Sequence, residues 1–170
     1  MSNQRPSGPD YLRLVQLLHA LHAAADPLLT AWAKDSRTCG QLSIPLRAPS
    51  FAHDLAALSA APLAQLSFTD LPRTAAGTLT EPAGIGLLYV VAGSSLGARV
   101  LLRRLPSSVP FQARAGLEHG ASAASVQLWA AVLTLLALPA PVEDAATGAA
   151  VCSSVFDTLL GLVQGATRPV

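Results

Sequence analysis

Apolar residues recur every three or four positions along most of the chain, which is the period of an amphipathic helix. The clearest case is the segment 11–33, where one apolar stripe is formed by Leu14, Leu18, Leu21, Ala25 and Leu29. Pro27 lies inside this segment. It is expected to end or kink the helix, because proline lacks an N–H and clashes with the preceding turn.

The same pattern predicts further helices at 51–60, 83–105, 111–119, 121–138 and 143–165. Ser50 is expected to cap the first of them, since a serine oxygen accepts hydrogen bonds from a helix start. No stretch alternates apolar and polar residues as a half-buried strand does. We expect an all-α fold of five to six helices in one domain, residues 10–165, with a disordered N-terminus at 1–9 and a tail at 166–170.

Composition narrows the class of protein. The chain is 51% hydrophobic and 12% charged, with a net charge of +1, so it lacks the basic surface of a nucleic-acid-binding protein. Two cysteines, Cys39 and Cys152, do not make a disulfide framework. The first ten residues are polar and lack the apolar core of a signal peptide. We therefore expect a cytoplasmic protein with free thiols.

One uncharged stretch, residues 120–142, raises the question of a membrane span. Its densely apolar part is LWAAVLTLLAL, residues 128–138, which is shorter than the roughly 20 residues that a spanning helix needs. Pro139 and Pro141 follow it. We expect a buried core helix here and no membrane span.

The helix predicted at 83–105 carries glycines at 84, 86, 93 and 97. A glycine inside a helix costs about 1 kcal/mol relative to alanine. Gly86, Gly93 and Gly97 fall on one face of the helical wheel, with Val90 beside them and Ser94 one step round. Such a smooth groove can hold either a closely packed neighbouring helix or a flat ligand lying against the backbone.

The string LLYVVAGSSLGARVLLRRL, residues 87–105, resembles the distal helix of heme oxygenases. It is most similar to the bacterial, phytochrome-associated branch, whose pattern is roughly YVLEGSxLGGxxLxRxL. The matching positions are Tyr89, Gly93, Ser94, Leu96, Gly97, Leu101, Arg103 and Leu105. Other segments resemble the same family in the same order. LHALHAAADPLL is similar to its second helix, HDLAALSA to its third and GASAASVQLWAAVLTLLAL to a later helix, so the resemblance spans residues 10–165.

This resemblance implies a heme-oxygenase-like bundle that binds heme and opens it to biliverdin, CO and iron. It implies a cofactor-binding groove formed by Tyr89, Gly93, Ser94, Gly97 and Arg103. In the family, the glycines let heme lie against the distal helix, and Arg103 could pair with a heme propionate. An electron donor or a phytochrome is the implied partner.

The sequence also departs from the family. The helix that carries the proximal histidine precedes the LHALHAAADPLL segment in the family, and only ten residues without a histidine stand there. Ala92 and Ala130 replace an acidic residue and an arginine of the family. Since heme chemistry depends on the axial ligand, we expect impaired catalysis, with His22 as the candidate replacement ligand. A missing helix exposes apolar surface, which another chain, such as a second copy, or a lipid-like ligand would cover.

Three hypotheses follow: an active heme oxygenase, an inactive relative that binds heme or a bilin or regulates a phytochrome system, and a helical interaction module. A metal site is a further alternative, because His19, His22 and Asp26 share one helix side and two histidines with a carboxylate can bind non-heme iron. Only Glu118 and His119 could supplement them, so we predict no metal site. His53 and His119 are expected to be exposed.

Overall fold

A computed structural model describes residues 8–39 and 42–165, and within them the chain is all-α, as expected. The described elements are α1 (Gly8–Asp35), α2 (Ala48–Ala57), α3 (Glu81–Gly93), α4 (Ala98–Arg104), the 3-10 turn η1 (Phe111–Arg114), α5 (Ala115–Gly120), α6 (Ala123–Leu136) and α7 (Val142–Gly165). An isolated bridge between Arg73 and Leu79 is the one β-type pairing in these ranges. Joined across their breaks, residues 81–104 and 111–136 are two long helices, so the described chain has five.

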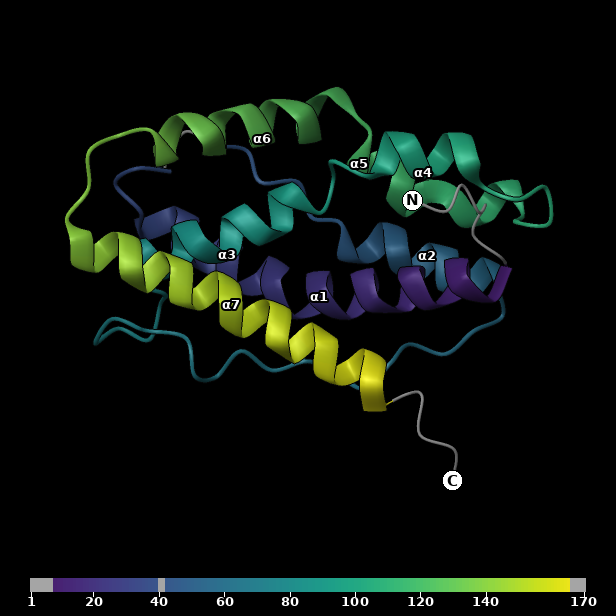
Figure 1. Cartoon of the computed structure of the whole chain (residues 1–170), viewed down its shortest axis with the longest axis horizontal. Helices are drawn as coiled ribbons and strands as arrows, with labels where there is room; N and C mark the ends of the chain where they lie inside the picture. The colour runs from purple at the N-terminus through teal and green to yellow at the C-terminus, as the bar shows by residue number, and fades with distance from the viewer. Residues whose placement is uncertain (1–7, 40–41, 166–170) are drawn as a thin grey trace.

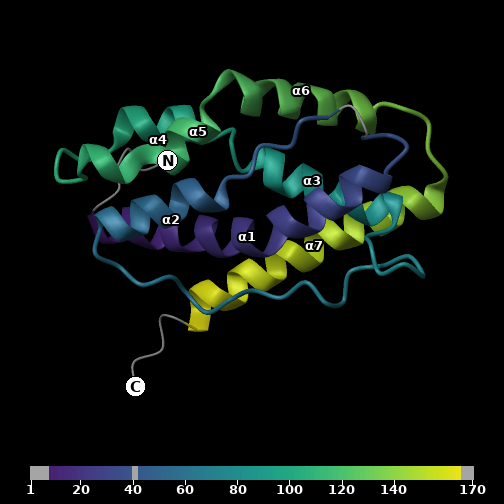
Figure 2. The same ribbon diagram turned by 180° about the vertical axis from the view of Figure 1, so that it is seen from behind.

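The arrangement is layered (Figure 1). α3 lies between α6 on one side and α1 on the other, and α7 crosses α1 and α3 obliquely. Seen from behind, the long connection 58–80 runs along the edge opposite α6 (Figure 2). The predicted disordered segment 1–9 lies outside the described residues except for Gly8 and Pro9, which begin α1. The predicted tail, 166–170, lies wholly outside them.

Pro27 does not end its helix, because α1 continues for eight residues to Asp35. The buried stripe explains this result: Leu21 and Ala25 before the proline and Leu29 and Trp32 after it are all buried in one core. Packing on both sides of Pro27 therefore outweighs the lost backbone hydrogen bond.

The start of α2 differs from the prediction of a Ser50 cap. The helix begins at Ala48, and the carboxylate of Asp26 on α1 accepts hydrogen bonds from the N–H groups of Arg47 and Ala48, both at 2.9 Å. Ser50 instead contacts His119. The free N–H groups of a helix start can be satisfied by any acceptor in reach, and here another helix supplies it.

The glycine-rich helix α3 packs closely against its neighbours. A Cβ on Gly84 would lie 2.1 Å from the Trp32 ring, and one on Gly86 would lie 2.5 Å from the backbone oxygen of Gly148 on α7. Both distances are far below van der Waals contact. At these two positions the smooth face holds a neighbouring side chain and a neighbouring helix, rather than a flat ligand.

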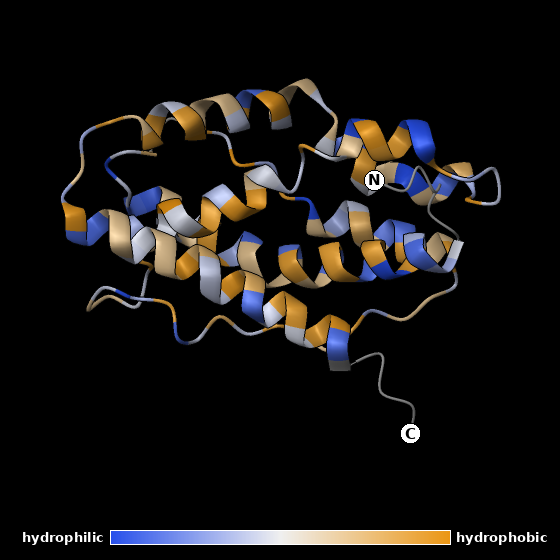
Figure 3. Ribbon diagram, viewed as in Figure 1, coloured by the Kyte–Doolittle hydropathy of each residue, from blue (hydrophilic) through white to orange (hydrophobic). Residues whose placement is uncertain are grey.

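The expectation of a buried core helix at 121–138 is wrong. In α6 only Ser125, Leu128 and Val132 are buried, while Leu133 and Leu136 are exposed. Figure 3 shows apolar residues distributed along α6 and α7 at the edge of the molecule. The apolar run is therefore a surface helix that buries one narrow stripe.

Three helices are long and apolar enough to cross a membrane by length and composition: Glu81–Arg104, Phe111–Leu136 and Val142–Gln164. The second of them includes residues 128–136 of the stretch that looks too short when residues 128–138 are considered alone. Continuation of the helix through η1 and α5 gives it 26 residues. That the chain has no membrane span and that it is cytoplasmic are therefore still predictions from the sequence.

Candidate functional site

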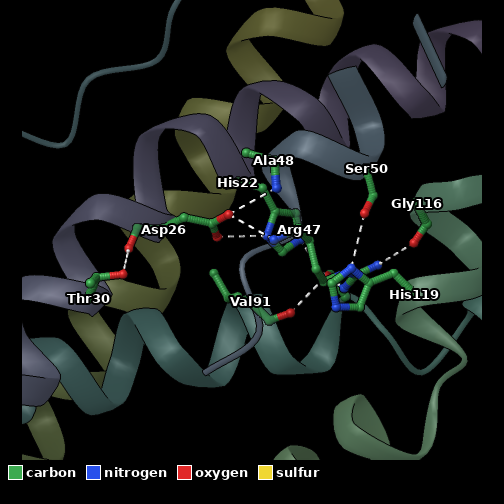
Figure 4. A network of polar contacts seen from close by, with 10 residues as sticks. His22, Asp26, Thr30, Arg47, Ala48, Ser50, Val91, Gly116 and His119 are labelled. Atoms are coloured by element: carbon green, nitrogen blue, oxygen red, sulfur yellow. Dashed lines mark hydrogen bonds and ion pairs between the residues drawn. The ribbon is translucent and has the colours of Figure 1, made fainter. Parts of the chain in front are cut away.

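A network of buried polar side chains joins four parts of the fold (Figure 4). His22 and Asp26 come from α1, Arg47 from the residue before α2, Ser94 from the break between α3 and α4, and His119 from α5. The interior is mostly alanine, leucine and valine. Burying polar groups is unfavourable unless they are hydrogen-bonded, so the network fixes how these segments meet.

Asp26 is the acceptor at the centre of this network. One carboxylate oxygen lies 3.1 Å from Nδ1 of His22, and the other accepts from the two N–H groups at the start of α2. The aspartate therefore fixes both a side chain on its own helix and the start of the next helix.

His22 is fully buried, with both ring nitrogens engaged. Nε2 lies 3.4 Å from Oγ of Ser94, and the ring packs on Phe51 at 5.5 Å between centroids. Burial holds the pKa of His22 below its usual value, so the ring is neutral at pH 7. The carboxylate then accepts a hydrogen bond from Nδ1–H, so Nε2 carries no proton and its lone pair faces Ser94. Ligation of heme iron would require His22 to give up one of these contacts.

Arg47 is a central residue that the sequence analysis missed. Only 2% of it is exposed, and its Nη1 donates to Oγ of Ser94 at 2.9 Å and its Nη2 to the Gly116 carbonyl at 3.4 Å. Its Nε has no hydrogen-bond partner within the described part of the chain. Burial lowers its pKa to about 10, against the raising effect of Asp26, so it stays charged at neutral pH.

No periodic signal marks Arg47, because it lies in an irregular segment between Pro45 and Pro49. Gly120 is the one indirect signal of a buried Arg47 that the contacts suggest. A Cβ there would lie 2.4 Å from Nη2 of Arg47, so the small residue makes room for the guanidinium.

Ser94 lies where the long helix breaks. The backbone N–H groups of Ser95, Leu96 and Ala98 bond to carbonyls three residues back, which is 3-10 geometry in the middle of a helix. The Ser94 hydroxyl donates to the Val91 carbonyl at 2.7 Å. This break falls at the predicted cofactor groove.

The structure brings some of the predicted groove residues together and separates others. Tyr89 stacks on Trp129 of α6 at 5.4 Å, and a Cβ on Gly93 would touch that same ring at 3.4 Å. Gly93 is therefore partly covered by α6. Gly97 is exposed, and a Cβ there would meet only Leu101 at 3.8 Å. Arg103 is exposed on α4, one and a half turns beyond Gly97.

His53 and His119 differ in their exposure to solvent. His53 is exposed, as expected. His119 is half-buried, with its Nδ1 3.0 Å from the Ser50 hydroxyl, so the expectation of exposure is wrong for it. Among the described residues no group of three or more His, Cys, Asp or Glu side chains could hold a metal ion.

An apolar cavity of about 470 Å³ lies between α3, α6 and α7. Its lining includes Ile85, Tyr89, Leu135, Ala149 and Cys152. Its volume is in the range of small-molecule sites. Tyr89 is the one residue of the predicted groove that reaches it.

Comparison of the chain with protein-family models, with curated proteins and with solved structures finds no match. The resemblance to heme oxygenases therefore rests on the residues that carry it.

Proposed function

We propose that this chain is a heme-oxygenase-like protein that binds heme or a bilin, and that it is impaired in the family's usual ring-opening reaction. The observation that carries the proposal is the break at residues 94–97, where an open glycine lies beside exposed apolar residues and is followed by arginines. The resemblance assigns heme contact to this same part of the helix. A cytoplasmic protein serving a phytochrome system, with a second copy as a candidate partner, belongs to the same proposal.

The outer face of the break suits a flat amphipathic ligand. Leu96 is 57% exposed and Val100 48% exposed, and Gly97 between them leaves the backbone accessible. Arg103 and Arg104 are exposed at the end of α4. An apolar surface that ends in guanidinium groups matches a tetrapyrrole, whose ring is apolar and whose propionates pair with arginine.

The same residues do not supply an axial ligand. Heme, when bound, would supply an iron centre for oxygen chemistry, which depends on a protein ligand to the metal. None of the four histidines lies on α3 or α4, and His22 is held by Asp26 and Ser94. The residues thus fit the tetrapyrrole ring and its carboxylates, but not the iron. This difference supports a non-catalytic binding or regulatory protein over an active oxygenase.

The test is a hemin titration of the purified chain, followed by ascorbate under air. We expect a saturable Soret band at one hemin per chain that persists after ascorbate is added. Gly97→Leu places a side chain on the open face and should weaken hemin binding by at least about tenfold, or 1.4 kcal/mol. Gly161→Leu is the matched control, since Gly161 also lies on an open helix face, in α7.

Other results would contradict the proposal in distinct ways. A Soret band that decays into broad red absorption would show an active oxygenase. Equal affinities of the wild type and Gly97→Leu would exclude the face. If Ala149→Phe abolished binding instead, the ligand would lie in the apolar cavity. The absence of saturable binding would leave only the interaction-module hypothesis.

A further inference from the structure

The contacts of Ser94, His22 and Asp26 have the order of a nucleophile, a base and an orienting carboxylate. Ser94 Oγ lies 3.4 Å from His22 Nε2, and His22 Nδ1 lies 3.1 Å from Asp26 Oδ1. Serine hydrolases on unrelated folds share this order of contacts, and it is recognised by geometry rather than by position in the sequence. We propose that Ser94 is the nucleophile of an acyl-transfer site that cleaves small apolar carboxylic esters.

His22 is arranged to act as the base. Its Nδ1 proton is directed at Asp26, so the lone pair of Nε2 faces Ser94. Asp26 is itself held by two backbone N–H groups of the next helix, which fixes the carboxylate and through it the imidazole ring. Asp26 is therefore a positioning residue that acts through His22.

Ser94 needs only a hydroxyl rotation to engage this base. Its proton is now donated to the Val91 carbonyl at 2.7 Å, and the 3.4 Å separation from Nε2 is long for a hydrogen bond. Catalytic hydrogen bonds are commonly long before substrate binds and shorten in the complex. The half-buried position of Ser94 at the helix break places it between the exposed backbone of Gly97 and the buried network.

Arg47 supplies the positive charge that such a reaction requires. Its Nη1 donates to Ser94 Oγ at 2.9 Å, and its Nε is a buried donor without a partner in the described residues. A fixed donor at the reacting centre stabilises the negative charge that develops on the substrate, and Nη1 is the Arg47 donor that lies next to Ser94 Oγ. An unsatisfied donor at this position is otherwise unexplained, because buried polar groups are normally paired.

The reaction balances with water as the only co-reactant. Ser94 Oγ attacks the ester carbonyl carbon and passes its proton to His22 Nε2. The bond from that carbon to the alcohol oxygen breaks, and His22 returns the proton to the leaving alcohol. Water, deprotonated by His22, then cleaves the acyl-serine, which releases the acid and restores the hydroxyl. Leu96 and Gly97 follow Ser94 in the chain and are exposed, and we expect them to contact a small apolar acyl group.

The test is labelling of the full chain with a fluorophosphonate, with the modified residue located by mass spectrometry, and hydrolysis of p-nitrophenyl butyrate. We expect one label, on Ser94, which is absent in Ser94→Ala. Ser95→Ala is the matched control, because Ser95 also donates to a carbonyl three residues back and has no contact with His22 among the described interactions. His22→Gln should slow labelling by about 10²-fold or more, the usual contribution of a general base.

The pH profile distinguishes a base from a structural residue. His22 faces Asp26, Arg47 and His119. Burial lowers its pKa from the usual 6.5, Arg47 and His119 act in the same direction, and Asp26 opposes them. The pH at which labelling is half-maximal should therefore lie below 6.5.

A folded wild-type chain that takes no label at Ser94 would overturn the proposal. So would labelling at Ser94 that proceeds at an equal rate in His22→Gln. Circular dichroism melts of each variant show whether it is folded, and if His22→Gln is unfolded, the pH profile of the wild-type chain decides. Fluorophosphonate labelling and the hemin titration have separate readouts, so failure of this proposal is distinguishable from failure of the proposed function.

Discussion

Two regions of this molecule are held together in opposite ways. Around α1, α2 and α5, buried polar side chains such as Asp26, Arg47 and Asp54 bond to the backbone of other helices. Along α6 and α7, by contrast, large apolar side chains are exposed to solvent. Burial therefore does not follow hydrophobicity along this chain.

The polar region shows how short helices are fixed by hydrogen bonds from side chains of other helices. Asp54 is completely buried, and its two oxygens accept from the N–H groups of Ala115 and Gly116 at the start of α5, at 2.7 and 2.9 Å. Asp26 does the same for α2. Each aspartate caps a helix that is distant in sequence, so side-chain hydrogen bonds orient α2 and α5 in addition to the packing of Phe51, Leu55 and Leu117.

The apolar region shows the reverse. The most exposed of its large side chains are Leu136, Leu138, Val142, Phe156 and Leu160. Extended apolar patches on a protein surface mark an interface with a partner, a ligand or a membrane. The glycine contact between α3 and α7 is the close-packed part of this region, and the outward faces of α6 and α7 are unpaired within the described chain.

The largest expected effect is on the polar region. Asp26→Ala removes the acceptor of two backbone N–H groups and of His22, and it leaves the Arg47 charge buried. We expect a loss of about 3–5 kcal/mol in the free energy of unfolding, the range for breaking a buried charged network. Urea denaturation measures it. Asp157→Ala, at an exposed site on α7, is the control. A loss below about 1 kcal/mol would mean that the network does not fix α2.

A smaller effect is expected where the two regions join through α3. In Gly86→Ala the new methyl group would lie 2.5 Å from the Gly148 carbonyl oxygen, so α3 and α7 must separate. Overpacking of this kind costs about 1–3 kcal/mol. Gly161→Ala, on the open face of α7, should instead stabilise by up to about 1 kcal/mol through helix propensity. Thermal melts of the pair should therefore shift in opposite directions, and shifts of equal sign would contradict the close contact.

The helices could be predicted from the sequence because the stripe at Leu21, Ala25 and Leu29 reports burial directly. The length of α1 could not be predicted from the sequence, because the residues that stabilise the helix beyond Pro27 by packing against it belong to other helices. Arg47 was out of reach for the same reason: its partners are 47 and 69 positions away in sequence, at Ser94 and Gly116. The residues next to a polar loop residue in the sequence do not show whether distant segments of the chain surround it in the folded protein.

The predicted groove shows the same limit. The spacing groups Gly86 with Gly93 and Gly97 on one face of a single helix, but α3 ends at Gly93 and Gly97 precedes α4, so their surroundings differ. Gly86 meets the α7 backbone, Gly93 meets Trp129 and Gly97 is open. A helical wheel assumes one straight helix, and the 3-10 turns after Gly93 change the direction of the chain. Only the tertiary structure tells which glycine serves packing and which leaves a surface free.

The smallest expected change in stability comes from the exposed apolar side chains themselves. Leu136→Glu and Phe156→Glu alter residues that are about half exposed, on α6 and α7. If these faces meet only solvent, each change shifts the free energy of unfolding by no more than about 0.5 kcal/mol, as is usual for surface sites. Val132→Glu, at a buried site in the same helix, should be far more destabilising. Sedimentation of the wild type and the two glutamate variants shows whether these faces bind a second copy of the chain. If they do, the wild-type chain sediments as a dimer and both glutamate variants sediment as monomers. A wild-type chain that is monomeric without detergent would exclude self-association through α6 and α7.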